Sequence, residues 1–301
     1  MKRFRSAIWR ALKWPLIAGT IVLVLLCLPV AYVELACRGD AQAEASIPLI
    51  TDPRWQRREA NTYLTYPEWH IVFAYDDLAK TLTAGDEYAF PYVSSVTGFW
   101  RSTCGLMRTA DGHGGADRET RSMIHTIGVS FTLEMAVKAA YEETIGRATA
   151  WWRGGVKTPQ DKVIADMATN YAAFLRQTPW YEYPFTREVH ALWAAPTDGF
   201  VRGWERRMGI SAEWLAKAAY ARVLAGAVAA AAPAQRAIHS VVTGVDARSL
   251  AAIPQVTVIA EHDGRIEIET PRYGLFTRIL VDIARRGGRV LDIAGNDDIR
   301  V

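Results

Sequence analysis

The sequence predicts a mainly α-helical protein with one N-terminal transmembrane helix and a small C-terminal α+β module. Three observations predict this class. An apolar segment without any charge occupies residues 14–33. Apolar residues then recur at helical spacing, and after residue 250 they alternate at strand spacing around an Asp-Gly turn. The predicted ranges are a basic tail at 1–13, the anchor at 14–33, a juxtamembrane tether at 34–61, a helical domain at 62–245 and an α+β (β-β-α-β) module at 246–301.

The segment 14–33 has the length and composition of a single-pass membrane span. About 20 helical residues at about 1.5 Å each cover roughly 30 Å, the thickness of the hydrocarbon core of a bilayer. Basic residues and no acidic residue precede it, which predicts a cytoplasmic N-terminus and a periplasmic remainder. Arg is far more frequent than Lys, which favours a GC-rich bacterial source. We therefore expect a signal anchor in a bacterial inner membrane.

A cleaved signal peptide is the alternative interpretation of this segment. Ala41-Gln42-Ala43 has the small-x-small form of a cleavage site. However, the apolar stretch is longer than the usual range of about 7 to 15 residues, and Ala43 lies about ten residues beyond its end. These lengths favour an anchor that is not cleaved.

The charge of the chain gives no support for nucleic-acid binding. The chain has 35 Lys and Arg residues, five of which precede Trp14, so 30 remain against 32 Asp and Glu residues. A remainder with a net charge of −2 lacks the clustered basic residues that phosphates require. The sequence likewise contains no glycine-rich phosphate loop or dinucleotide fingerprint, and we expect no cofactor.

Two of the three cysteines lie beyond the anchor. Cys27 falls inside the apolar segment, whereas Cys37 and Cys104 would face an oxidising compartment. They can form one disulfide or remain two thiols, because the geometry of a pair is not readable from sequence.

The helical domain contains several segments with start or stop signals. Thr65 and Glu68 form a capping-box pattern before Ile71, and Pro159 follows Thr158 at a typical first helical position. The residues from Met123 to Tyr141 are apolar almost all round, which predicts a central helix. Residues 88–108 are expected to be irregular, and a loop is expected at 111–115. The predicted helices cover approximately 65–82, 118–152, 158–177, 186–194 and 211–232.

The C-terminal module has the predicted order β-β-α-β. Asp263-Gly264 between alternating apolar residues is a strong hairpin signal. A helix near 276–283 ends in two glycines and precedes a strand at 290–294. One more short strand is expected to end at Val301.

Three histidines, His70, His113 and His125, are candidate acid–base residues, each with a simpler explanation. His70 and Asp77 lie on one helix face but about 10 Å apart, which is too far for direct contact. The preferred interpretation is therefore a solvated helix face. His125 and Glu134 interrupt the apolar central helix and are the best catalytic candidates if they are buried. We expect instead that Glu134, Lys138 and Glu142 form a solvent-facing charged stripe.

Two further groups are candidates for binding. Asp111, His113 and Asp117 offer metal ligands beside flexible glycines, but their spacing matches no standard metal loop, so a plain surface loop is favoured. Trp151 and Trp152 are adjacent on a helix end, so their rings point in different directions and are candidates for contact with a partner.

The leading functional hypothesis is a non-catalytic accessory or scaffold protein. It would be anchored in the inner membrane, with a periplasmic domain that assists a protein partner in or near the membrane. The sequence contains none of the standard hydrolase, zinc-protease or nucleotide-binding motifs. The alternative is an anchored envelope enzyme of hydrolase type that uses a histidine and a carboxylate for acid–base chemistry.

Overall fold

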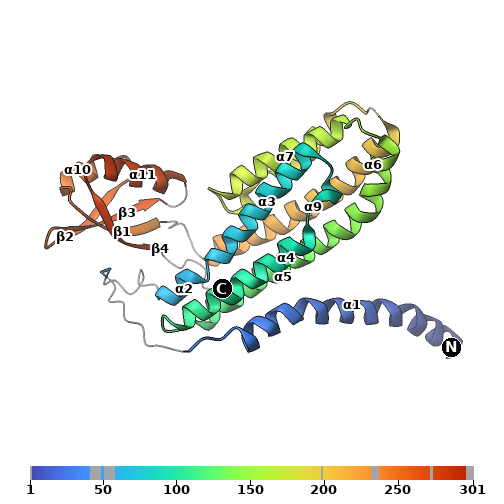
Figure 1. Ribbon diagram of the computed structural model, residues 1–301, viewed down its shortest axis with the longest axis horizontal. Helices are drawn as coiled ribbons and strands as arrows, with labels where there is room; N and C mark the ends of the chain where they lie inside the picture. Colours follow the sequence, from blue (N-terminus) through green and yellow to red (C-terminus); the bar gives the residue numbers. More distant parts are fainter. Residues whose placement is uncertain are drawn as a thin grey trace. The chain divides into compact units, whose positions relative to one another are not determined.

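The computed structural model describes residues 2–40, 49–50, 58–197, 199–231, 237–271 and 274–295. Over these residues the chain is mostly helical and ends in a four-stranded antiparallel sheet (Figure 1). The chain divides into two compact units, and helix α3 (Tyr66–Ala84) contributes to both. The first unit comprises Met1–Glu44, Glu59–Ala74 and Phe90–Ile145, and the second comprises Ala45–Arg58, Tyr75–Ala89 and Gly146–Val301.

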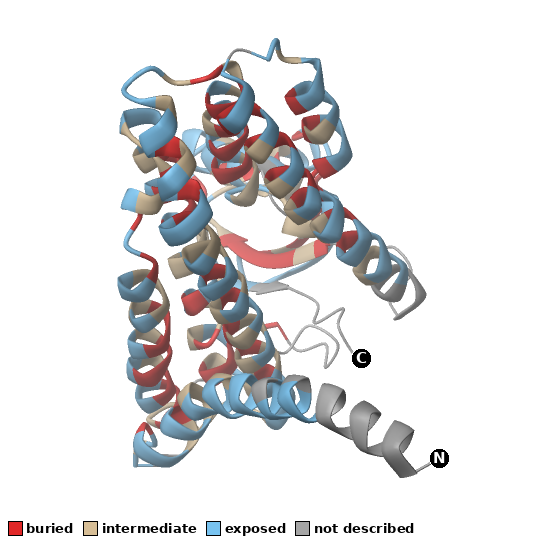
Figure 2. Ribbon diagram, turned by 90° about the vertical axis from the view of Figure 1, so that its right-hand side faces the viewer, coloured by how far each residue is buried: buried red, intermediate tan, exposed pale blue. Residues whose placement is uncertain are grey.

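Helix α1 (Lys2–Ala36) contains the predicted anchor. Its segment Gly19–Ala36 has a mean hydropathy of 2.2, and only 6% of that segment is buried inside the protein. In Figure 2 its described residues are largely exposed. The described part of the chain thus contains one helix that is long and apolar enough to cross a membrane.

The core of the first unit lies between α4 (Tyr92–Asp111) and α5 (Arg118–Tyr141), beside the short helix α2 (Glu59–Tyr63). Asp117 caps α5 by accepting a hydrogen bond of 2.7 Å from the Thr120 amide. The close approach of α4 and α5 depends on Gly128, which leaves room for the rings of Phe99 and Trp100. The Trp100 indole also donates to the Thr132 hydroxyl at 2.9 Å.

The second unit contains the helices that follow a π-helical turn at Glu142–Gly146. Thr158 and Asp161 form a capping box at the start of helix α7. Short 3-10 turns lie at Glu87–Ala89 and Trp180–Glu182. The α-helices of this unit are α6 (Arg147–Arg153), α7 (Pro159–Leu175), α8 (Phe185–Ala194) and α9 (Phe200–Ala231).

The C-terminal sheet has the strand order β2-β3-β1-β4, with antiparallel pairing throughout. Asp263 and Gly264 connect β2 to β3 with φ angles of 50° and 72°, as a tight hairpin turn requires. Buried aliphatic side chains of the sheet pack with those of the two helices in one core. The elements are β1 (Ala237–Thr243), α10 (Ala247–Ala251), β2 (Thr257–His262), β3 (Arg265–Pro271), α11 (Gly274–Arg285) and β4 (Arg289–Gly295).

Helices α3, α7 and α8 and the hairpin at Asp263-Gly264 confirm the sequence predictions within a few residues. The irregular structure predicted for residues 88–108 is wrong, because α4 occupies most of this range. Its serines, threonines and glycines have weak helix propensity, but packing of the buried Phe99 and Met107 outweighs that preference.

Three other expectations differ from the structure. Helix α9 begins at Phe200 rather than after Ser211. The buried residues Arg206 and Ile210 extend the helical spacing of its buried face toward the N-terminus. Strand β1 was not predicted and lies before the expected boundary at residue 245, since the buried His239 and Ser240 hide its apolar character. The cleavage motif at 41–43 and the strand expected to end at Val301 lie outside the described residues.

Helix α5, which was predicted to be a central helix because it is apolar almost all round, is buried along one face only. Its buried residues follow one stripe, whereas Leu133 and Val137 are 44% and 61% exposed. Of the charged stripe expected to face solvent, Glu142 is buried, and the regular α-helix gives way to the π-helical turn at this residue. Helix α5 therefore has an exposed uncharged face as well as a buried one.

Candidate functional site

The end of the predicted anchor is fixed to α4. Cys37 and Cys104 form a disulfide with an S–S distance of 2.07 Å, and both residues are buried. The Gly39 amide donates to the Asp111 carboxylate at 2.8 Å, and the Arg108 guanidinium donates to the Ala36 carbonyl at 3.0 Å. Residues 34–39, expected to begin a loose tether, are instead held against the helical body.

Glu34 is the polar centre of this junction. Its Oε1 lies 2.7 Å from Nε2 of His125 on α5, and its Oε2 lies 3.4 Å from the Arg121 guanidinium. Arg38 approaches the same oxygen at 3.8 Å. Three basic side chains therefore face one carboxylate, which binds the last turns of α1 to the first turns of α5.

The His125 ring is almost enclosed at this position. Its side chain is 12% exposed, and the ring lies nearly parallel to Trp100 with 6.3 Å between the ring centres. Its Nδ1 atom is buried and has no hydrogen-bond partner among the described residues. Nε2 is engaged with Glu34, so one ring nitrogen is hydrogen-bonded and the other is buried.

An open cleft of about 540 Å³ lies between α1 and α5 beside this cluster. Arg118 and Arg121 line the cleft together with Glu34 and His125, and Val30 and Val129 also line it. The cleft therefore combines basic, hydroxyl and apolar groups within the first unit.

The structure does not bring His125 and Glu134 together. The partner of His125 is Glu34, which the sequence analysis did not select as a site residue. One signal in the sequence could have identified Glu34, because it is a carboxylate at the end of an apolar segment. A carboxylate that is buried there needs a basic partner. A contact over 91 residues of sequence cannot be inferred from the spacing of residues within one helix.

His70 and Asp77 also have separate surroundings. Nε2 of His70 lies 2.9 Å from the Ser95 carbonyl oxygen, and the ring fills the space beside Gly98. The Asp77 carboxylate accepts a hydrogen bond from the Lys80 ammonium at 2.8 Å on the surface. The two residues therefore do not share a site.

The three candidate metal ligands point to different partners. Asp111 contacts Arg38 and the Gly39 amide, whereas Asp117 caps α5. Nδ1 of His113 lies 3.2 Å from the Glu59 carboxylate. Within the described ranges, no group of three His, Cys, Asp or Glu side chains is arranged to hold a metal ion.

Both tryptophans of the predicted partner-binding pair are on the surface. Trp151 and Trp152 of α6 are 81% and 71% exposed, and Phe200 at the start of α9 is 76% exposed. The Arg202 guanidinium of α9 donates to the Thr149 hydroxyl of α6 at 2.9 Å, so these two helix segments are neighbours. We refer to Trp151, Trp152 and Phe200 as the aromatic end of the second unit.

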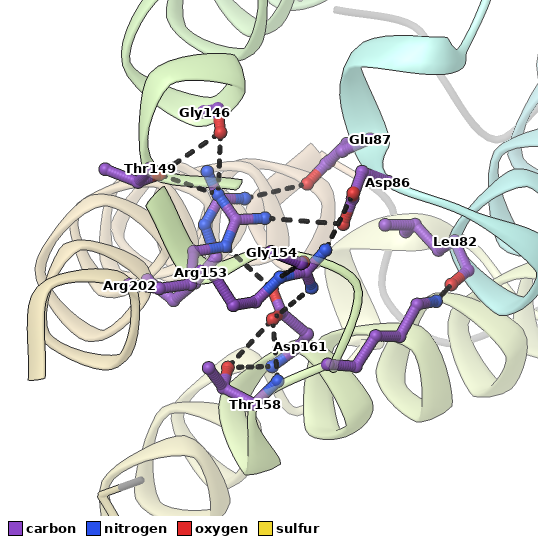
Figure 3. A network of polar contacts seen from close by, with 12 residues as sticks. Leu82, Asp86, Glu87, Gly146, Thr149, Arg153, Gly154, Thr158, Asp161 and Arg202 are labelled. Atoms are coloured by element: carbon purple, nitrogen blue, oxygen red, sulfur yellow. Dashed lines mark hydrogen bonds and ion pairs between the residues drawn. The ribbon is translucent and has the colours of Figure 1, made fainter. Parts of the chain in front are cut away.

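Buried ion pairs connect several helices of the second unit (Figure 3). Arg153 lies 2.9 Å from Asp86 and 2.8 Å from Asp161, and Arg202 lies 2.9 Å from the other oxygen of Asp161. Burial alone would raise the pKa of Asp161, but Arg202, the Thr158 hydrogen bonds and Arg153 together hold it below its usual value.

The neighbouring Arg206 extends this network to Glu87 and Glu205, at 3.3 Å and 2.6 Å. The space enclosed beside these residues is about 10 Å³, which is no more than one water molecule needs. The charges are thus satisfied by one another, and the network holds helices together rather than binding a ligand.

Comparison of the chain with known protein families, with characterised proteins and with solved structures finds no match.

Proposed function

We propose that the protein is a non-catalytic accessory protein anchored by α1 in a bacterial inner membrane, with its folded units in the periplasm. In this role it would hold or assist a protein partner in or near the membrane. The aromatic end carries the proposal, because it leaves Trp151, Trp152 and Phe200 largely exposed to solvent.

Exposure of large aromatic side chains costs solvation free energy, and protein interfaces recover that cost. Tryptophan is among the residues that contribute most to binding energy at such interfaces. Trp151 and Trp152 make up two of the seven residues of a short helix, and Val156 just beyond it is 81% exposed. Several large apolar side chains exposed on and beside one short helix favour a protein-binding surface over a solvated one.

The apolar helix and the fixed junction support the anchoring part of the proposal. Helix α1 exposes its apolar side chains along the segment Gly19–Ala36, which suits contact with lipid. The disulfide and the Glu34 contacts hold the end of this helix against α4 and α5. A partner bound to the protein would thereby be kept near the bilayer.

Site-specific photocrosslinking in cells tests the partner role. A photoreactive residue at position 151 should give the same crosslinked protein repeatedly, and the Trp152→Ser variant should reduce that product severalfold. The exposed Lys162 on α7 is the matched control position and should give no such product. Absence of any recurrent product at 151, 152 and 200, with the protein recovered alone from mild detergent, would contradict the proposal.

An anchored enzyme of hydrolase type is the second candidate, and one observation favours it. The His125–Glu34 contact of 2.7 Å lies beside an open cleft, as an acid–base pair would. Complementation of a deletion strain separates the two functions. If the protein is an enzyme, His125→Gln should fail to complement and Trp151→Ser should complement. If it is an accessory protein, Trp151→Ser should fail and His125→Gln should complement. Both variants must accumulate to normal levels for this comparison.

A further inference from the structure

The two ends of the cleft beside Glu34 lie at different positions along the anchor helix. At one end, Glu34 of α1 contacts Arg121 and His125 of α5. Val30, one turn earlier in α1, lines the same cleft as Val129, one turn later in α5. The two helices therefore run in opposite directions along the cleft, and moving along α5 from Arg121 to Val129 leads toward the apolar interior of the anchor.

The chemical character of the cleft changes along this direction. Arg118 and Arg121 lie at the end where the anchor terminates, Ser122 and Thr126 follow, and Val129 and Ser130 lie at the end nearer the apolar segment. Beyond the cleft, the same face of α5 continues with the exposed Leu133 and Val137. The charged side chains thus gather at one end of the cleft and the two valines lie at the other, which is the polarity of a membrane lipid.

The basic end has an unused positive charge. Glu34 is already faced by Arg38, Arg121 and His125, so its carboxylate does not neutralise Arg118. Arg118 is exposed and makes no hydrogen bond or ion pair with the part of the chain that the structure describes. Nε of Arg121 is buried and likewise lacks a partner there. An anionic group at this end would receive charge-assisted hydrogen bonds from two guanidinium groups.

We propose that the cleft binds one phospholipid of the leaflet at which the anchor ends. Its phosphate contacts Arg118 and Arg121, and an acyl chain lies along Val30 and Val129. The volume of about 540 Å³ suits a head group with the first part of its chains. The proposal rests on the membrane placement in the proposed function, because only then do the two ends of the cleft match the head-group region and the hydrocarbon.

The test uses the purified full-length protein in a mild uncharged detergent. Dihexanoyl phosphatidylglycerol is titrated while the midpoint of thermal unfolding is followed, and inorganic phosphate is titrated in parallel. Arg118→Gln removes the unused charge without disturbing the Glu34 cluster, and Arg118→Lys keeps the charge. Arg101→Gln is the matched control, because Arg101 is an exposed arginine of α4 that does not line the cleft.

The lipid should raise the midpoint of the wild type and of Arg101→Gln. Arg118→Gln should bind it about tenfold more weakly or worse, since the variant loses a charge-assisted hydrogen bond to the phosphate. Arg118→Lys should bind at an intermediate strength. Equal affinity of Arg118→Gln and Arg101→Gln would overturn the proposal. Inorganic phosphate that binds as tightly as the lipid would show a simple anion site and would also overturn it.

Failure of the lipid-binding proposal can be distinguished from failure of the proposed function. A protein that crosslinks to its partner but does not distinguish Arg118→Gln from Arg101→Gln would lose only the lipid site. A protein that is soluble in cells with its amino end intact would lose the anchoring, whatever the titration gives.

Discussion

Oε1 of Glu34 lies 2.7 Å from Nε2 of His125, although 91 residues separate them in the sequence. This contact joins the last turns of the apolar helix to the central helix of the first unit. The disulfide between Cys37 and Cys104 lies within one turn of Glu34 along the chain. The end of the apolar helix is therefore part of the folded first unit, and its contribution to stability can be measured directly.

Loss of the disulfide should lower the free energy of unfolding by about 4 kcal/mol. The bond closes a loop across a sequence separation of 67, and the chain-entropy model assigns about that value to a loop of this length. Denaturant unfolding of Cys104→Ser in mild detergent, compared with the wild type, measures the change. Cys27→Ser is the control, because Cys27 is an exposed free cysteine and its replacement should leave stability unaltered.

The Glu34–His125 contact should contribute a coupling free energy of about 1 kcal/mol. The His125 side chain is 12% exposed and that of Glu34 is 31% exposed, so water screens the interaction only in part. A double-mutant cycle with Glu34→Gln and His125→Gln isolates this quantity. Additive single effects would show that the two side chains are neighbours without a stabilising interaction.

Gly128→Ala should destabilise the first unit by about 1 to 3 kcal/mol. A Cβ atom at this position would lie 2.8 Å from the Trp100 ring and would also overlap the Phe99 ring, both of which are buried. Gly105→Ala on α4 is the matched control. A Cβ there meets nothing within 4 Å, so alanine should be neutral or slightly stabilising through its better helix propensity. Equal effects of the two substitutions would contradict the tight α4–α5 packing.

Asp161 should make the stability of the second unit depend on pH in the acid range. Its folded pKa lies below the ordinary value of 3.8, since Arg202, the Thr158 hydrogen bonds and Arg153 outweigh the effect of burial. The stabilisation that ionised Asp161 gives the folded state is therefore complete at pH values above 3.8. It is lost as the pH falls through the lower pKa of the folded state.

Asp161→Asn should cost about 3 to 5 kcal/mol at pH 7, because it leaves two buried guanidinium groups without their shared carboxylate. The difference between variant and wild type should shrink as the pH falls below about 4. Asp77→Asn, which alters an exposed ion pair with Lys80, should show neither effect. A difference that stays constant down to pH 2 would show that the Asp161 pKa is not lowered by folding.

Local signals in the sequence were sufficient for some elements. The capping box at Thr158 and Asp161 and the Asp-Gly turn at residue 263 define their elements through contacts of neighbouring residues. Helix α4 and strand β1 lacked such signals. Their residues are placed by long-range packing, as in the fit of Phe99 and Trp100 against Gly128, and no local pattern records this contact.

The candidate site depends on long-range contacts to a greater degree. His125 was recognisable as a polar residue in an apolar helix, but its partner Glu34 belongs to a segment that was expected to be a tether. The buried Arg202 and Arg206 were likewise hidden, because isolated arginines in a sequence usually lie on the surface. Only the fold supplies the carboxylates that allow them to be buried.

The most direct test of the membrane placement is protease treatment of intact spheroplasts that contain the full-length protein with an N-terminal epitope. Anchoring by α1 predicts that protease added outside removes the folded units and leaves a short membrane-bound fragment that retains the epitope. A protein that remains intact until the spheroplasts are lysed, or that is released as a soluble chain still bearing the epitope, would contradict this placement.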